Sequence, residues 1–213
     1  VGQVEEAEAE AKRRAGARGE IVEFADYASN VGEREGSGRS AVAIVGGEGA
    51  IVTGRGGGGS FGGGSSIHSD DTAEAIYDAI EDKSVKAIVF RVSSPGGSPE
   101  ASEQILAAVR AARAAGKPVV VSMGAYAASG GYWISSEADW IVAQPTTLTG
   151  SIGVFGMVPN FTRTLDRFGV HSDGVGTTRY AGAFDLTRPM EADVGRVIQA
   201  SVEHIYRNFV GKV

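Results

Sequence analysis

The sequence predicts an α/β fold, a mostly parallel sheet with flanking helices. Residues 86–92 and 118–123 are short, nearly continuous apolar runs, as in strands that are covered on both faces. Between them, residues 98–115 carry apolar side chains at helical spacing. A short helical stretch at 129–136 leads to a third strand at 140–143. This alternation of strand and helix predicts parallel strands that are joined by right-handed crossovers.

Composition narrows the classes of function. The chain has 213 residues, of which 42% are hydrophobic, enough for one substantial core. A net charge of −6 without a basic run argues against nucleic-acid binding. The chain has no cysteine, which excludes disulfides, thiolate zinc sites and cysteine nucleophiles. No apolar run approaches the length of a membrane span, and the start at Val1 without a signal peptide indicates a piece of a longer protein.

The chain divides near residue 40 into a helical and linker segment at 1–40 and a main domain at 41–213. In the first segment, residues 4–18 have the composition of a solvated helix with a weak apolar face. A short strand at 21–27 and a polar linker follow.

The main domain begins with two apolar runs, 41–45 and 50–53, which flank a glycine-rich turn and predict a β-hairpin. The glycine-rich stretch 54–64 lacks the Gly-Lys-Ser/Thr ending of a phosphate-binding loop and has the composition of a flexible loop. Asp70 or Asp71 then caps a helix. The inner face of this helix carries Ala73, Ile76, Tyr77 and Ile80.

Beyond Pro145 the pattern is less regular. Residues 149–156 are rich in turn formers, residues 160–168 predict a helix and residues 170–172 a short strand. A long amphipathic helix is predicted to close the chain. Its apolar face carries Met190, Val194, Val197, Ile198, Ile205 and Phe209.

Two loops follow the carboxyl ends of the first two buried strands, where ligands bind in open α/β sheets. Residues 93–98 (SSPGGS) and 124–133 (GAYAASGGYW) are dense in glycine and small residues, and each leads into a helix. If the two strands are neighbours, these loops face one another across a single cleft.

Ser129 is the candidate nucleophile in the second loop. It stands at a helix start, where backbone N–H groups are unpaired and favour negative charge. A tetrahedral oxyanion formed on Ser129 would meet the N–H of Gly130, and Gly97 is placed to supply a second donor. The alternative is that Ser129 only caps the helix and the glycines only form tight turns.

A nucleophilic serine needs a base, and the chain offers none that is convincing. The histidines His68, His171 and His204 lie outside the two loops and read as ordinary surface or partly buried residues. Lysine serves as a base only when it is desolvated, yet the lysines precede strands or lie in solvated terminal helices. These lysines are Lys12, Lys83, Lys86, Lys117 and Lys212.

The spacing of histidines and carboxylates predicts no metal site, and no cofactor is expected. Tyr132 and Trp133 read as core residues of their helix.

Three long motifs resemble the signal peptide peptidase A (protease IV) family of bacterial serine peptidases. They are KAIVFRVSSPGGSPEASE, AAGKPVVVSMGAYAASGGYWISSEADWIVAQPTTLTGSIGVFG and FGVHSDGV. The resemblance runs from about Val42 to the end and is densest between Lys86 and Gly156. It implies a Clp protease/crotonase-like fold and a Ser–Lys dyad that degrades residual signal peptides. By this resemblance Ser129 matches the nucleophile, Gly97 the oxyanion-hole loop, and Gly130 the residue after the nucleophile.

The chain departs from the family pattern in the residue that acts as the catalytic base. Short members carry the base lysine about fifty residues after the serine, where this chain has GTTRYAG at 176–182. Arg179 cannot replace it, because a guanidinium stays protonated. The chain therefore resembles the second half of long, tandem-repeat members, whose first half supplies the lysine. It also stops at Val213, before the family's closing segment, and has Tyr126 where methionine is more usual. We expect the isolated chain to be inactive.

The resemblance also implies partners and a location. It implies cleaved signal peptides as substrates, a homo-oligomer that is commonly a tetramer, and an upstream membrane anchor. The active site is expected on the outer, periplasmic face of the bacterial cytoplasmic membrane. Two alternatives stay open: a crotonase-type acyl-thioester enzyme, and a non-catalytic half that only builds an oligomer. The first usually needs an acidic residue as acid or base, and Glu100 and Glu103 follow the Gly97 loop but read better as first-turn helix residues.

Overall fold

The computed structural model describes Arg13 and residues 40–56 and 65–213. Residues Ser40–Val213 form a compact unit of their own. The strand predicted at 21–27 and residues 57–64 of the glycine-rich stretch lie outside the described residues, as does the helix predicted at 4–18 apart from Arg13.

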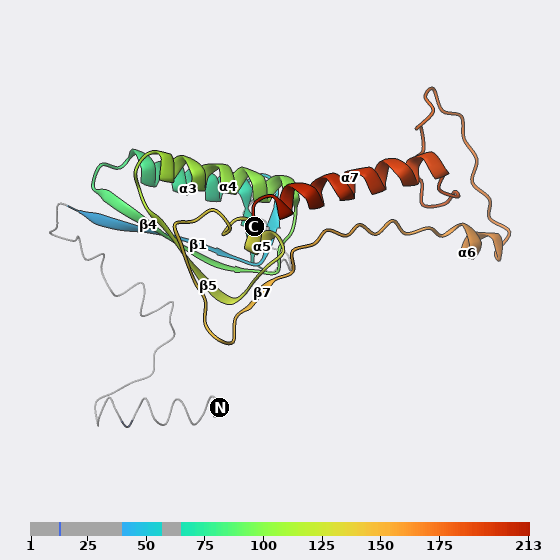
Figure 1. The fold of residues 1–213 in the computed structure, drawn as a ribbon. Coiled ribbons are helices and arrows are strands. Elements are labelled where there is room, and N and C mark those ends of the chain that lie inside the picture. Colours follow the sequence, from blue (N-terminus) through green and yellow to red (C-terminus); the bar gives the residue numbers. More distant parts are fainter. Residues whose placement is uncertain (1–12, 14–39, 57–64) are drawn as a thin grey trace. The chain divides into compact units, whose positions relative to one another are not determined.

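A parallel sheet forms the centre of the unit 40–213 (Figure 1). Its strands lie in the order β1 (Ala41–Glu48), β4 (Val85–Ser94), β5 (Val119–Ala128) and β6 (Trp140–Val142). Strand β7 (Leu148–Gly150) pairs with the last residues of β5. All of these pairings are parallel, so the predicted fold class is confirmed.

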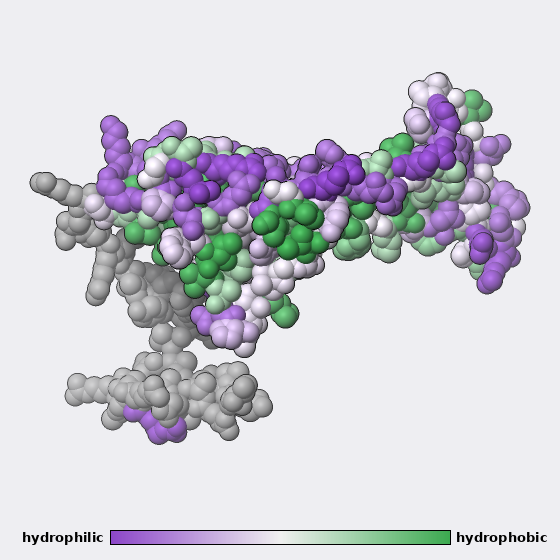
Figure 2. All heavy atoms as spheres, in the orientation of Figure 1, coloured by the Kyte–Doolittle hydropathy of each residue, from purple (hydrophilic) through white to green (hydrophobic). Residues whose placement is uncertain are grey.

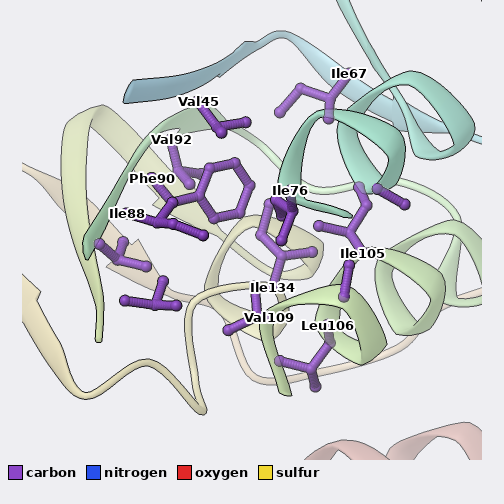
Figure 3. Packing of buried hydrophobic residues seen from close by; sticks show 14 of the residues in the cluster. Val45, Ile67, Ile76, Ile88, Phe90, Val92, Ile105, Leu106, Val109 and Ile134 are labelled. Atoms are coloured by element: carbon purple, nitrogen blue, oxygen red, sulfur yellow. The ribbon is translucent and has the colours of Figure 1, made fainter. Parts of the chain in front are cut away.

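Helices α3 (Ser69–Glu81) and α4 (Pro99–Ala114) lie side by side on one face of the sheet (Figure 1). Their outward side is largely hydrophilic (Figure 2), as expected for amphipathic helices on a surface. Their inward side chains meet those of β4 in a hydrophobic core (Figure 3). Phe90 of β4 and Ile105 and Leu106 of α4 are all fully buried. The predicted apolar runs therefore build the core.

Helix α4 shows how the sequence sets a helix start. The Oγ of Ser98 accepts a hydrogen bond from the N–H of Ala101 at 3.1 Å, and Pro99 occupies the first helical position. A proline is tolerated there because the first helical N–H groups have no intrahelical partner. The end of the loop 93–98 is thereby held at a fixed place above the sheet.

The predicted hairpin between 41–45 and 50–53 is wrong. Strand β1 pairs with β4, whereas β2 (Ala50–Val52) pairs in parallel with β3 (Ser66–His68) in a separate small sheet. Gly49 has a φ of 95°, and a Cβ there would lie 1.7 Å from the carbonyl oxygen of Ser65. At this glycine turn the chain runs close to the start of β3. Strand β2 therefore pairs with β3 and does not fold back on β1.

Other element predictions need smaller corrections. Helix α3 begins at Ser69, and the carboxylate of Asp71 accepts a hydrogen bond from the N–H of Gly56 at 2.8 Å instead of capping the helix. Tyr77 is exposed, and residues 170–172 form no strand. The shorter predicted helix is α6 (Thr162–Asp166), and the closing helix is α7 (Ala192–Val210).

The end of α7 returns to the body of the unit. Phe209 is 1% exposed, and its ring lies 4.7 Å, centroid to centroid, from that of Trp133 in the short helix α5 (Gly130–Trp133). Across the described residues, no helix combines the length and the apolar character that a membrane crossing requires.

Candidate active site

The two glycine-rich loops meet at the carboxyl end of the sheet. Strands β4 and β5 are direct neighbours, with Val92 opposite Met123 and Ser94 opposite Ala127. Because parallel strands end at the same edge, the residues that follow them lie on the same side of the sheet. The predicted neighbourhood of the loops 93–98 and 124–133 is confirmed by this pairing.

Ser129 stands at the junction of β5 and α5 in an unusual backbone conformation. Its φ is 52° and its ψ −120°, a region that residues other than glycine rarely adopt. The turn is held on both sides, because the Ser129 N–H donates to the carbonyl of Gly150 and the Ser129 carbonyl accepts from the N–H of Trp133, each at 2.9 Å. A strained serine on a strand-to-helix turn is the arrangement that presents a nucleophile to substrate.

The side chain of Ser129 is not used as a cap. It accepts no hydrogen bond from α5, and the residue is partly exposed. Among the described residues the Ser129 hydroxyl has no hydrogen-bond partner, which argues against the alternative that Ser129 only caps its helix.

Gly97 is held by β2 so that its own N–H remains free. The N–H of Ile51 donates to the carbonyl of Gly96, and the N–H of Ser98 donates to the carbonyl of Ile51, each at 2.9 Å. These two bonds flank Gly97 and leave its N–H without an acceptor among the described residues. A Cβ on Gly97 would lie 2.0 Å from the carbonyl oxygen of Ile51, so only glycine fits.

The free amides of Gly97 and Gly130 lie close together. A Cβ built on Gly130 would lie 3.1 Å from the nitrogen of Gly97, and Gly130 belongs to the unpaired first turn of α5. Gly96 has a φ of 107°, and a Cβ there would lie 2.7 Å from both the Gly130 nitrogen and the Ser129 Cβ. Two backbone donors beside one serine form the arrangement that stabilises an oxyanion.

A small cavity of about 110 Å³ opens beside Ser129. Most of its wall is apolar, with contributions from α5, from the segment after β7 and from the end of α7. Its lining residues are Gly97, Pro99, Ser102, Ser129, Gly130, Trp133, Gly153, Val154, Phe155, Ile205 and Phe209. The sequence predicted only that Ile205 and Phe209 lie on the apolar face of a helix. An amphipathic pattern does not identify the surface against which that face packs.

The described histidines lie away from this cavity. His171 pairs with Asp166 at 3.2 Å and His204 with Asn208 at 3.1 Å, both on exposed surface. His68 lines a separate hollow of about 1000 Å³ between β1, β3 and α3. None of the three lines the cavity beside Ser129.

Two of the described lysines, Lys86 and Lys117, are engaged elsewhere. The ammonium of Lys117 donates to the carbonyls of Ala79 and Asp82 at 2.6 Å, and that of Lys86 donates to the carbonyl of Lys83 at 2.7 Å. Arg179, in the stretch 176–182, pairs with Asp193.

Lys212 corrects the sequence prediction of a solvated side chain. It is only 16% exposed, because its ammonium pairs with Glu103 at 3.2 Å and lies 5.4 Å from the centre of the Trp133 ring. This ammonium is thus paired with Glu103, and Lys212 is not among the residues that line the cavity beside Ser129.

The carboxylates near the first loop are also committed. Glu100 accepts from the hydroxyl of Ser98 at 2.9 Å. Burial alone would raise the pKa of Glu103, but hydrogen bonds from Arg110, Trp133 and Lys212 outweigh burial and hold that pKa below its ordinary value. The lowered pKa of Glu103 argues against a role for this carboxyl as the acid of a thioester enzyme. The described residues also contain no cluster of histidine and carboxylate side chains that could hold a metal ion.

Comparison with known proteins places the chain among peptidases. Residues 111–213 match the profile of peptidase family S49. The chain is 51% identical over 169 residues to Protease 4 of Salmonella typhi, a match that covers 79% of this chain and 26% of that protein. It is 42% identical over 192 residues to Protease 4 of Haemophilus influenzae, covering 89% of this chain and 30% of that protein. The chain thus spans less than a third of the length of these two relatives.

Among solved structures, the chain is similar to a ClpP1 mutant from Listeria monocytogenes, with a TM-score of 0.34 and 18% identity over 49% of this chain and 52% of that chain. The α/β class rests on the parallel sheet of the chain itself. The family profile and the identity to both Protease 4 relatives agree with the motifs around Ser129, and the chain belongs to peptidase family S49, the family of signal peptide peptidase A.

Proposed function

We propose that this chain is the nucleophile-bearing half of a membrane-associated serine endopeptidase of the Ser–Lys type. The observation that carries the proposal is the junction of β5 and α5. There, a free and partly exposed Ser129 hydroxyl lies beside the unpaired N–H groups of Gly97 and Gly130. Membership in family S49 supports the same reaction class.

The reaction begins at the Ser129 hydroxyl. Its oxygen attacks the carbonyl carbon of the scissile peptide bond, and its proton passes to the neutral amine of a lysine in another part of the full-length protein. The carbonyl oxygen becomes an oxyanion that accepts hydrogen bonds from Gly97 and Gly130. Each such donor contributes about 3–4 kcal/mol to the stability of the transition state.

The second half of the reaction frees the serine. The C–N bond breaks as the protonated lysine gives its proton to the leaving amine, and an acyl ester remains on Ser129. Water then attacks the ester with the lysine as base, the carboxylic acid leaves, and the Ser129 hydroxyl is restored. This chain supplies the nucleophile and the oxyanion donors but not the base, so the isolated chain is inactive.

The cavity supports apolar peptide substrates. Its wall next to Ser129 includes Val154, Phe155 and Phe209, which favour an uncharged side chain beside the scissile bond. Residual signal peptides, which are apolar and lie at the outer face of the cytoplasmic membrane, fit this requirement.

An edge of the sheet supports assembly of the full-length protein with copies of itself. Strand β6 lies at the edge, where Trp140 is 71% exposed and Val142 is 52% exposed. An apolar edge of this kind is unusual on a protein that stays monomeric. We therefore propose a homo-oligomer.

The test uses full-length protein and an apolar peptide with a fluorogenic group. Ser129→Ala should lower kcat/KM at least about a thousandfold, since it removes the nucleophile. Ser136→Ala is the matched control, because Ser136 lies just beyond α5 and its hydroxyl donates to the carbonyl of Trp133 at 2.8 Å. Full activity of Ser129→Ala would overturn the proposal. Binding of an acyl thioester without any acyl-serine would favour a crotonase-type enzyme instead.

A further inference from the structure

Three cationic or N–H donors converge on one carboxylate behind the candidate active site. Glu103 of α4 accepts from the indole N–H of Trp133 at 2.9 Å, from the guanidinium of Arg110 at 2.7 Å and from the ammonium of Lys212 at 3.2 Å. These donors belong to α5, to α4 and to the residues just after α7. Glu103 thus joins three elements that are far apart in the sequence.

The carboxylate is itself held firmly by Arg110. The guanidinium of Arg110 also binds both oxygens of Glu137, at 2.7 and 2.5 Å. A guanidinium that binds two carboxylates through its planar fork fixes their orientation better than a flexible ammonium does. Glu103 therefore has a defined position from which to orient Trp133.

One partner of this carboxylate lines the cavity, and a second follows closely after a residue that does. Trp133 lines the cavity directly, and Lys212 lies three residues after Phe209, which lines the cavity and packs on the Trp133 ring. The ring of Trp133 and the end of α7 form adjoining parts of one wall. The contact between the Trp133 and Phe209 rings, 4.7 Å between centroids, joins these two parts of the wall.

We infer that Glu103 is a positioning residue that sets this wall, and with it the size of the side chain accepted next to the scissile bond. The inference rests on the proposed function and adds a determinant of specificity to it. Glu103 acts through Trp133 and through the end of α7. A change at Glu103 should alter the choice between substrates more than the reactivity of Ser129.

The first measurement is substrate selectivity in the full-length protein. Peptides that differ only in one residue, valine or phenylalanine, before the scissile bond are compared by kcat/KM. Glu103→Leu should change the valine-to-phenylalanine ratio about tenfold in favour of phenylalanine, because a loosened wall admits the larger ring. Glu103→Gln should change it less, because its amide oxygen still accepts from the Trp133 indole.

A double-mutant cycle tests whether the effect passes through Trp133. Trp133→Phe removes the indole N–H and keeps a ring against Phe209, so it should also shift the ratio. In the Trp133→Phe background, Glu103→Leu should lose most of its own effect. Full additivity of the two changes would overturn the inference.

The second measurement does not depend on activity. Hydrogen exchange of the full-length protein should speed up in peptides that cover residues 130–134 and 203–213 of Glu103→Leu, and Lys212→Met should speed up only the second. Glu81→Leu, on the exposed end of α3, is the matched control and should change neither. Unchanged exchange and unchanged selectivity would refute the role of Glu103. Faster exchange without Ser129-dependent hydrolysis in any variant would instead refute the proposed function.

Discussion

At the scale of single residues, the account depends on how the chain forces Ser129 into its turn. A serine at φ 52° is strained by contacts of its Cβ, and the bonds to Gly150 and Trp133 hold it there. The neighbouring glycines are needed for space, since a side chain at Gly96 would collide with the Ser129 turn. The candidate site thus depends on backbone strain at Ser129 and on the absence of side chains at Gly96, Gly97 and Gly130.

The strain predicts an order of stability among inactive variants. Ser129→Gly removes the Cβ that opposes the positive φ, whereas Ser129→Ala keeps it. We expect Ser129→Gly to be more stable than Ser129→Ala by about 1–2 kcal/mol, measured by denaturant unfolding of the two full-length proteins. An alanine variant as stable as the glycine variant would show that this turn carries no strain.

At the scale of elements, ion pairs attach α4 to the chain that follows α5. Arg110 binds Glu137, and Arg113 binds Asp139, whose other oxygen accepts from the N–H of Val119 at the start of β5. The Arg110 hydrogen bonds lower the pKa of Glu137, and the Val119 N–H, with Arg113, lowers the pKa of Asp139. These contacts tie α4 to residues 137–139 and to the start of β5.

These lowered pKa values predict weaker stability in acid. Carboxyls whose pKa is lower in the folded than in the unfolded state contribute stability above the ordinary carboxyl range, and the contribution is lost as the pH falls through the folded pKa. We expect the melting temperature to fall between about pH 5 and pH 3. Glu137→Gln should lower the melting temperature at pH 7 and make it less dependent on pH in the acid range. An identical acid slope in this variant would contradict the role of Glu137.

Which elements can be predicted from sequence follows from how each is stabilised. Strands β4 and β5 are rich in apolar residues, so their composition alone reveals them. The predicted cover on both faces is wrong, because buried residues largely alternate with more exposed ones along β4, where Lys86 and Arg91 are exposed. Strand β7 has only the residues Leu-Thr-Gly, and its pairing with the end of β5 comes from tertiary structure. The hairpin prediction failed because an apolar run does not say which strand it pairs with. In the candidate site, the two loops and Ser129 could be predicted, but the wall from α7 and the burial of Lys212 could not.

At the scale of the whole molecule, the chain spans less than a third of the Protease 4 relatives, and the proposed reaction needs a base from elsewhere in the full-length protein. The proposed homo-oligomer likewise needs a contact surface on this chain. The β6 edge of the sheet, where Trp140 and Val142 are exposed, is the surface that we propose for it.

The assembly proposal predicts a response to a charge at that edge. Trp140→Lys in the full-length protein should shift the mass distribution towards smaller species in analytical ultracentrifugation, because a lysine blocks apolar pairing of edge strands. Tyr77→Lys replaces another exposed aromatic, on α3, and should leave the distribution unchanged. Identical distributions for both variants would rule out β6 as a contact.

The most direct test of the account is the position of a covalent adduct. Full-length protein is treated with a small fluorophosphonate and digested, and the peptide that contains residue 129 is weighed and fragmented. The account predicts one added phosphonyl group on the oxygen of Ser129 and none in Ser129→Ala. An adduct on another serine of this chain, or labelling that persists in Ser129→Ala, would contradict it.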